Sequence, residues 1–165
     1  MNDIIVNWNL VTRGMPRGKN AANDRTPTIE EIKKLLEYPD RRIKPIVLMM
    51  ISSGIRIGAF DYLKLKHISP LKYNNGKLVA AKMIVYAGES DQYTAFISPE
   101  AYNYYIEWLD FRASYGEKLN ENSWVMRDAW KTTNITYGAK LGYAKDPLKL
   151  KSSGIRSLLS KALFQ

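Results

Sequence analysis

The stretch SSGIRIGAFDYLKLKHI, residues 52–68, decides the fold of this chain. Just before it, residues 43–51 are almost wholly apolar, which predicts a buried helix. Gly54 stands where such a helix would end on a left-handed residue. The apolar residues that follow recur at roughly helical spacing: Ile57, Phe60, Leu63 and Ile68. This spacing predicts a second, amphipathic helix after a tight corner.

Arg56 lies at this corner, beside the predicted core, and we expect its side chain to be buried or half-buried. An unpaired buried charge is very costly, so such an arginine needs an anionic partner. Two interpretations stay open. One is a structural salt bridge to a carboxylate or a contact with helix-end carbonyls. The other is a phosphate ligand, for which the planar guanidinium fork is well suited.

Residues 53–68 resemble the first catalytic arginine box of the tyrosine recombinase (phage-type integrase) family. The residues that carry the resemblance are Ser53, Gly54, Ile55, Arg56, Ile57, Gly58, Phe60, Leu63, Lys64 and Ile68. Two positions depart from the family pattern: Ala59 replaces a common Glu, and His67 replaces a frequent Asp. From about Arg17 to the C-terminus, the flanking sequence is similar to the archaeal branch of that family.

The resemblance implies an α+β fold that is mainly α-helical, with helices packed around a small antiparallel sheet or hairpin. It implies that residues 1–25 are a basic linker, the tail of a missing N-terminal DNA-clamping domain. Residues 26–165 would be an incomplete integrase-like catalytic domain. In that family a tyrosine attacks a phosphodiester while arginines and histidines hold the phosphate. Arg56 would then bind the scissile phosphate.

Composition favours a nucleic-acid partner. The 165 residues carry a net charge of +9, which suggests an anionic partner, and nucleic acid is the usual one. The chain has no cysteine and one histidine, His67, so thiolate and His-cluster metal sites are excluded and we expect no cofactor. No apolar run approaches the ~20 residues of a membrane span, and no signal peptide is visible. We expect a cytoplasmic, nucleoid-associated protein with no membrane partner.

Basic residues gather at two places. Arg41, Arg42 and Lys44 stand at the start of the predicted helix over residues 43–51, where three cations are unfavourable for the helix dipole. This favours an external anion, although a solvated surface is the alternative. Residues 139–165 carry six Lys and Arg against only Asp146, a local charge of +5. We take as candidate DNA-binding residues Arg41, Arg42, Lys44, Lys149, Lys151 and Arg156.

Two runs predict antiparallel strands, over residues 78–86 and 93–97, with a hairpin loop between them and a third edge over residues 72–76. The resemblance implies that a lysine on this hairpin donates a proton to the leaving 5′-oxygen of DNA. The loop itself offers Glu89 and Asp91 but no lysine. Lys82, on the first strand, is the candidate. The alternative is an exposed lysine that blunts a sheet edge.

The C-terminal half is predicted to be helical. Ser98-Pro99-Glu100 is typical of a helix start, and that helix should run to about Tyr115. Trp124 and Trp130 form an aromatic patch that more often packs in a core than stacks on bases. Further helices are predicted from Thr132 or Thr133 to about residue 141, and over residues 152–164.

The pentapeptide SSGIR occurs twice, at residues 52–56 and 152–156. In one interpretation Arg156 is the second arginine of the family, from a His-x-x-Arg box, with Ser153 where the histidine should be. In the other, the repeat is accidental and the box lies beyond Gln165. We favour the second, because the last helix resembles the segment that precedes the box in archaeal integrases.

These observations predict a DNA-binding, integrase-like protein that is truncated, lacks the second arginine box and the nucleophilic tyrosine, and is inactive alone. Its partners would be double-stranded DNA and a complementary integrase fragment or other recombinase protomers. Two alternatives stay open on the same scaffold. One is a non-catalytic DNA-binding or regulatory module, and the other is a protein-interaction domain whose basic surface is incidental.

Overall fold

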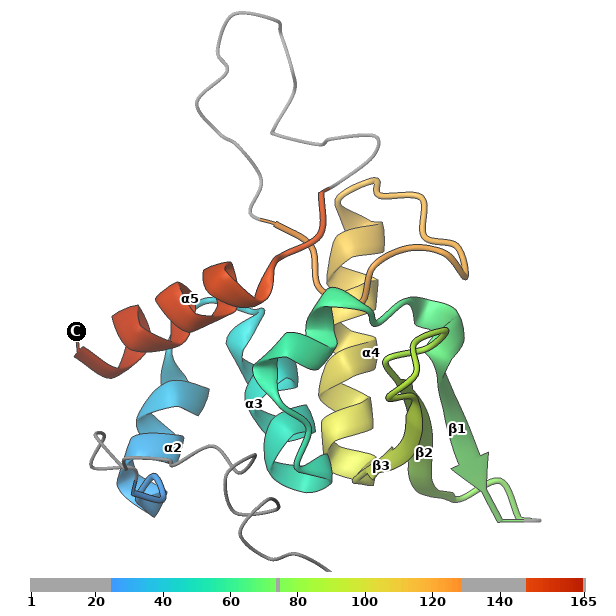
Figure 1. Ribbon diagram of the computed structural model, residues 1–165, viewed down its shortest axis with the longest axis horizontal. Coiled ribbons are helices and arrows are strands. Elements are labelled where there is room, and N and C mark those ends of the chain that lie inside the picture. Colours follow the sequence, from blue (N-terminus) through green and yellow to red (C-terminus); the bar gives the residue numbers. More distant parts are fainter. Residues whose placement is uncertain (1–24, 74, 129–147, 165) are drawn as a thin grey trace, which may run out of the picture.

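The computed structural model describes residues 25–73, 75–128 and 148–164. The elements follow in the order α2 (Ile29–Glu37), α3 (Ile43–Ser53), the 3-10 helices η1 (Ile57–Asp61) and η2 (Leu65–His67), β1 (Ile68–Lys72), β2 (Leu78–Val85), β3 (Tyr93–Ile97), α4 (Pro99–Ser114) and α5 (Ser152–Phe164). In Figure 1, α3 and α4 lie side by side, with the sheet on one flank and α2 and α5 on the other. The predicted α+β class, mainly helical, is confirmed.

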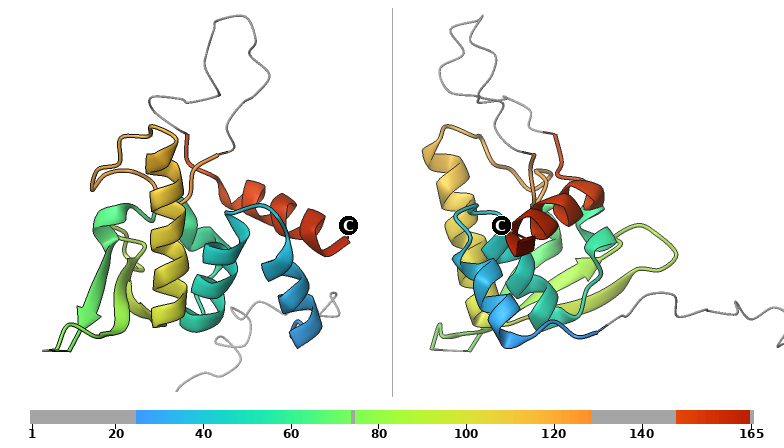
Figure 2. Two further views of the ribbon diagram at one scale, coloured as in Figure 1. Left: turned by 180° about the vertical axis from the view of Figure 1, so that it is seen from behind. Right: turned by 90° about the vertical axis from the view of Figure 1, so that its left-hand side faces the viewer.

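The three strands form one antiparallel sheet in the order β1-β2-β3, so β2 is the central strand. Its inward residues Ala81, Met83 and Val85 are fully buried, and β2 and β3 pack against α4 and α3. The back view shows α4 crossing beside the sheet (Figure 2). The third strand was predicted over residues 72–76, but it comes earlier. Gly76, with φ of 79°, belongs to the turn that joins β1 to β2.

Two apolar clusters hold the elements together. The larger one joins α3, η1, the sheet, α4 and the start of α5, and includes Phe60, Met83 and Trp108. The smaller one joins α2, α3 and α5 through Leu35, Val47 and their neighbours. Burial of such side chains contributes about 1.5–3 kcal/mol each. The larger cluster therefore fixes η1, and with it the corner at Arg56, against the sheet and α4.

Local signals in the sequence set the helix ends. Thr28 accepts the Glu31 amide while the Glu31 carboxylate accepts the Thr28 amide, which confirms the predicted capping box. Ser98 caps α4 in the same way, by accepting from the Ala101 amide at 3.1 Å. Gly54 ends α3 with φ of 68°, a left-handed conformation that favours glycine.

The predicted second amphipathic helix is wrong. After Arg56 the chain forms two short 3-10 segments and then strand β1. A distant segment takes the backbone groups that a helix would use: the Val125 amide donates to the Leu63 carbonyl at 3.0 Å, and the Leu65 amide donates to the Ser123 carbonyl at 2.9 Å. The Lys64 amide donates to His67 Nδ1 at 3.2 Å. Long-range pairing therefore replaces the i to i−4 bonds of a helix.

Some predictions fall outside the described residues. These are the linker over residues 1–25, apart from Arg25, together with Trp130 and the helix over residues 132–141. Within the described ranges, no helix combines the length and apolar character that a membrane crossing requires. The same ranges contain no group of three or more His, Cys, Asp or Glu side chains that could hold a metal ion.

Candidate nucleic-acid interface

Arg56 is exposed. It is the N-cap residue of η1, with an extended backbone (φ −78°, ψ 153°), directly after the left-handed Gly54 and the buried Ile55. The expectation of a buried or half-buried side chain is wrong, because Ile55 and Ala59 occupy the core positions on either side of it. Its guanidinium makes no hydrogen bond or ion pair with the residues that the structure describes. The described residues therefore do not support the structural salt bridge, and none of them occupies the donors of Arg56.

Arg156 stands on an element that packs against the same corner. Helix α5 contacts η1, and the Ser152 amide at its start donates to Asp61 Oδ1 at 2.9 Å. Ile155 is fully buried, while Arg156 and Lys151 are exposed. Neither of these two cations has a hydrogen-bond or ion-pair partner in the described part of the chain. The two copies of SSGIR thus place Arg56 at the start of η1 and Arg156 on α5, which contacts η1.

Lys149 and Lys64 share one aromatic ring. Lys149 Nζ donates to the Asp61 carbonyl at 3.0 Å and lies 5.0 Å from the centroid of the Trp124 ring. Lys64 Nζ lies at the same distance from that centroid. Both lysines are half-buried, and their ammonium groups are thereby held in place. Lys149, predicted as a DNA-binding residue, is positioned by the fold, whereas Lys151 is exposed.

Lys82 lies on the central strand, where it pairs with Ser69 on β1 and Phe96 on β3. The alternative of a lysine at a sheet edge is therefore wrong. Its side chain is half-buried on the face of the sheet away from the core, beside Phe96, which is 53% exposed. No described residue pairs with its ammonium. The hairpin turn carries exposed Glu89 and Asp91, as the sequence indicated.

Arg42 is committed to an internal ion pair. Its Nε and Nη2 donate to the two carboxylate oxygens of Asp40 at 2.9 and 2.6 Å. Burial alone would raise the pKa of Asp40, but the hydrogen bonds and charge of Arg42 lower it below its ordinary value of 3.8. A bidentate, half-buried pair of this kind leaves little capacity for an external phosphate.

Arg41 and Lys44 lie on aromatic rings at this end of α3. The Arg41 guanidinium is 4.6 Å from the centroid of Phe111, and Lys44 Nζ is 5.2 Å from that of Tyr104. They line a cavity of about 400 Å³, whose wall also carries the acid Glu107. Helix α3 has 11 residues, or about 16 Å at 1.5 Å per residue, so the structure separates this cluster from the corner at its other end.

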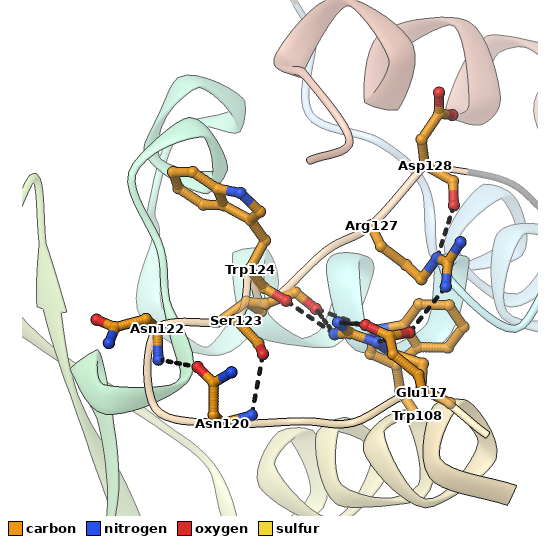
Figure 3. A network of polar contacts seen from close by, with 10 residues as sticks. Trp108, Glu117, Asn120, Asn122, Ser123, Trp124, Arg127 and Asp128 are labelled. Atoms are coloured by element: carbon orange, nitrogen blue, oxygen red, sulfur yellow. Dashed lines mark hydrogen bonds and ion pairs between the residues drawn. The ribbon is translucent and has the colours of Figure 1, made fainter. Parts of the chain in front are cut away.

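A buried ionic network was missed by sequence reasoning (Figure 3). Arg112 on α4 is 0% exposed and donates through Nε and Nη2 to the two oxygens of Glu117, while Arg127 donates to Glu117 Oε2 at 2.9 Å. Burial alone would raise the pKa of Glu117, but the hydrogen bonds and charges of both arginines lower it. The partners are separated by loop residues, and no periodic pattern marked them for pairing.

His67, the single histidine, forms a hydrogen bond with the main chain near this corner. Its Nδ1 accepts the Lys64 amide, and burial together with the neighbouring charge of Lys66 lowers its pKa. The ring is therefore mainly neutral at pH 7. Its contacts are structural, and it stands where the recombinase pattern often has aspartate.

Comparison with known proteins found a similarity in fold. No family model matches the sequence, and no curated protein matches it. Among solved structures, the fold is similar to that in the crystal structure of XerA recombinase, with a TM-score of 0.56 and 18% sequence identity. The match covers 86% of this chain and 44% of the XerA chain, so this chain spans less than half the length of that protein. The similarity is one of fold, to less than half of the XerA chain.

Proposed function

We propose that this chain binds double-stranded DNA through a recombinase-like scaffold, with Arg56 and Arg156 holding a backbone phosphate between them. The observation that carries the proposal is their placement. Two exposed arginines, each without an ion-pair partner among the described residues, stand on η1 and α5, which pack together. A guanidinium fork matches phosphate geometry and forms bidentate, charge-assisted hydrogen bonds.

This proposal gives Arg156 the role of the second arginine, the alternative that the sequence favoured less. The contact between α5 and η1, fixed by the hydrogen bond from Ser152 to Asp61, supports that choice. In the same scheme Lys82 stands on the strand next to the hairpin and acts as the general acid. Its position on the solvent side of a central strand is compatible with an approaching DNA strand.

We further propose that the chain does not rejoin DNA strands on its own. Ser153 stands where the recombinase pattern has histidine, and no tyrosine of the chain is recognisable as the nucleophile. Residues that act as a catalytic unit lose most of the rate when one member is absent. A partner that supplies the remaining groups, either another recombinase protomer or a complementary fragment, would be required for strand exchange.

The test is a titration of duplex DNA across a range of salt concentrations, with wild type and Arg56→Ala. We expect the wild-type affinity to fall as salt rises, and Arg56→Ala to weaken binding about tenfold or more, since a hydrogen bond to a charged group contributes about 1.5–3 kcal/mol. Lys33→Ala, which removes an exposed positive charge on α2, is the control. Wild-type affinity that is independent of salt would contradict phosphate binding.

One observation favours a second candidate function, a protein-interaction module. The solvent side of the sheet exposes apolar side chains, Phe96 at 53% and Leu71 at 40%. Exposed apolar patches mark contact surfaces when they are contiguous. If this face binds a protein, Phe96→Ser should abolish self-association or partner binding, measured by sedimentation, and leave the DNA titration unchanged.

A further inference from the structure

The ring of Trp124 is held beside two ammonium groups that come from distant parts of the chain. Lys64 follows η1, and Lys149 precedes α5; each Nζ lies 5.0 Å from the ring centroid. Cations within about 6 Å of an aromatic ring centroid are attracted by its electron-rich face. The two positive charges are therefore at most about 10 Å apart, since both distances are measured to one point.

The main chain that carries this ring is held by hydrogen bonds to the buried network. The Trp124 carbonyl accepts from Arg112 Nη1 at 2.8 Å, and the next carbonyl, that of Val125, accepts from the same nitrogen and from Trp108 Nε1 at 3.0 Å. Figure 3 shows the Trp124 carbonyl facing this buried network while its indole projects to the other side. A β-bridge also pairs Lys64 with Trp124. The ring is thus fixed in position before any ligand arrives.

The charge of the two lysines is not neutralised locally. Within the described ranges, neither ammonium forms an ion pair with a carboxylate. Asp61 accepts from Lys149 Nζ through its main-chain carbonyl, and its Oδ1 accepts the Ser152 amide. Each ammonium therefore keeps hydrogen-bond donors that have no acceptor in the described part of the molecule. Two unneutralised cations on a rigid platform are suited to an anionic ligand.

We propose that Lys64 and Lys149, held on Trp124, form a second contact with the DNA backbone, separate from Arg56. This inference rests on the proposed function. Arg56 caps the start of η1, and Lys149 binds its last residue, Asp61. Five residues of 3-10 helix span about 10 Å, which separates the two contacts along η1. The second contact would fix the direction of the strand whose phosphate the arginines hold.

A purely structural role for the lysines predicts a different response to substitution. Lysine stems cover apolar surface, and glutamine keeps part of that stem while it removes the charge. If Lys64 and Lys149 only cover Trp124, then Lys64→Gln/Lys149→Gln would leave DNA affinity unchanged. If they contact phosphates, the variant loses up to two counterion-releasing contacts.

The experiment measures the affinity of the full chain for a DNA duplex of about 20 base pairs across salt concentrations. We expect Lys64→Gln/Lys149→Gln to reduce the slope of log K against log salt by about 1–2, and to weaken binding about tenfold per contact at 0.1 M salt. The thermal midpoint should stay close to wild type, which shows that the loss is not unfolding. Lys33→Gln/Lys118→Gln, which removes two exposed lysines from other surfaces, should bind as wild type does.

The outcomes separate this inference from the function on which it rests. If wild type binds with a salt-dependent affinity that Arg56→Gln weakens, but the slope of the double lysine variant equals that of wild type, the second contact is overturned and the proposed function stands. If the control variant loses as much as the double lysine variant, the contact is not specific and is overturned too. If wild type shows no salt-dependent binding, both are overturned.

Discussion

The arginines of this chain occur in two contrasting settings. Arg112 and Arg127 are 0% and 2% exposed and share the carboxylate of Glu117. Arg56 and Arg156 are exposed, and neither has an ion-pair partner among the described residues. The chemical group is the same in both. Only its surroundings decide whether it holds the protein together or is available to a ligand.

The guanidinium groups of Arg112 and Arg127 are both used in internal hydrogen bonds. Two cations face one carboxylate, and the main-chain carbonyls of Trp124, Val125 and Asp128 accept further hydrogen bonds from them. Removing a charge from such a site leaves its partners desolvated and unpaired, which is costly. No such penalty applies to the exposed pair. Substitution should therefore affect stability at the first site and binding at the second.

The largest expected effect is on Glu117. Glu117→Gln removes the only carboxylate that the described structure places between Arg112 and Arg127, and we expect a loss of about 3–5 kcal/mol in the free energy of unfolding. Urea denaturation measures it. Glu121→Gln, an exposed change in the same loop, should stay within about 0.5 kcal/mol of wild type. A Glu117 variant as stable as wild type would remove the distinction between the two settings.

The acid dependence of stability sharpens the same comparison. The folded pKa of Glu117 is below its ordinary value of 4.5, so the unfolded chain binds its proton more readily. The contribution of Glu117 is therefore fully present above about pH 4.5 and is lost as the pH falls through the folded pKa. We expect wild-type stability to decrease over that interval. Denaturant titrations at several pH values should show that the free energy of unfolding of Glu117→Gln changes less with pH than that of wild type. An equal change with pH in the two proteins would contradict this prediction.

A smaller effect on stability is expected at Arg42, whose half-buried ion pair is intermediate between the buried and the exposed arginines. Arg42→Gln breaks its half-buried, bidentate pair with Asp40 and should cost about 1.5–3 kcal/mol of stability, the typical value for a hydrogen bond to a charged group. DNA affinity should change little, because these donors are already used. Thermal melting and a DNA titration of the same sample check both. A large loss of affinity with unchanged stability would place Arg42 in the DNA-binding set after all.

The smallest expected change in stability is at Arg56. Arg56→Gln removes no contact with a described residue, so the free energy of unfolding should stay within about 0.5 kcal/mol of wild type. Urea denaturation beside the Arg42 variant measures the difference. Clear destabilisation by Arg56→Gln would mean that this side chain belongs with the buried arginines.

Local signals in the sequence predicted much of the fold. The cap at Thr28, the cap at Ser98 and the left-handed Gly54 depend on residues within a few positions of each other, and all three are present in the structure. The apolar run before Gly54 predicted helix α3 for the same reason. Such features could be predicted because their hydrogen bonds close within one or two turns of the chain.

Features that depend on distant segments could not be predicted. The chain beyond Arg56 has the apolar spacing of a helix, but residues 121–125 pair with its backbone and hold it in short 3-10 turns. The sequence of a strand does not determine which strands pair with it. Lys82 could therefore have been on an edge strand, but the structure places β2 at the centre of the sheet. Arg56 itself was correctly placed at a corner, yet its exposure depended on which neighbours filled the core.

The most direct test of this account is the salt dependence of DNA affinity for wild type and for Arg56→Gln/Arg156→Gln. Each phosphate contact contributes about 0.9 to the slope of log K against log salt. Because both arginines hold one phosphate, we predict that the magnitude of the wild-type slope decreases by about 1 in the double variant, with an unchanged thermal midpoint. A slope that is the same in both proteins, or a wild-type affinity that does not respond to salt, would contradict it.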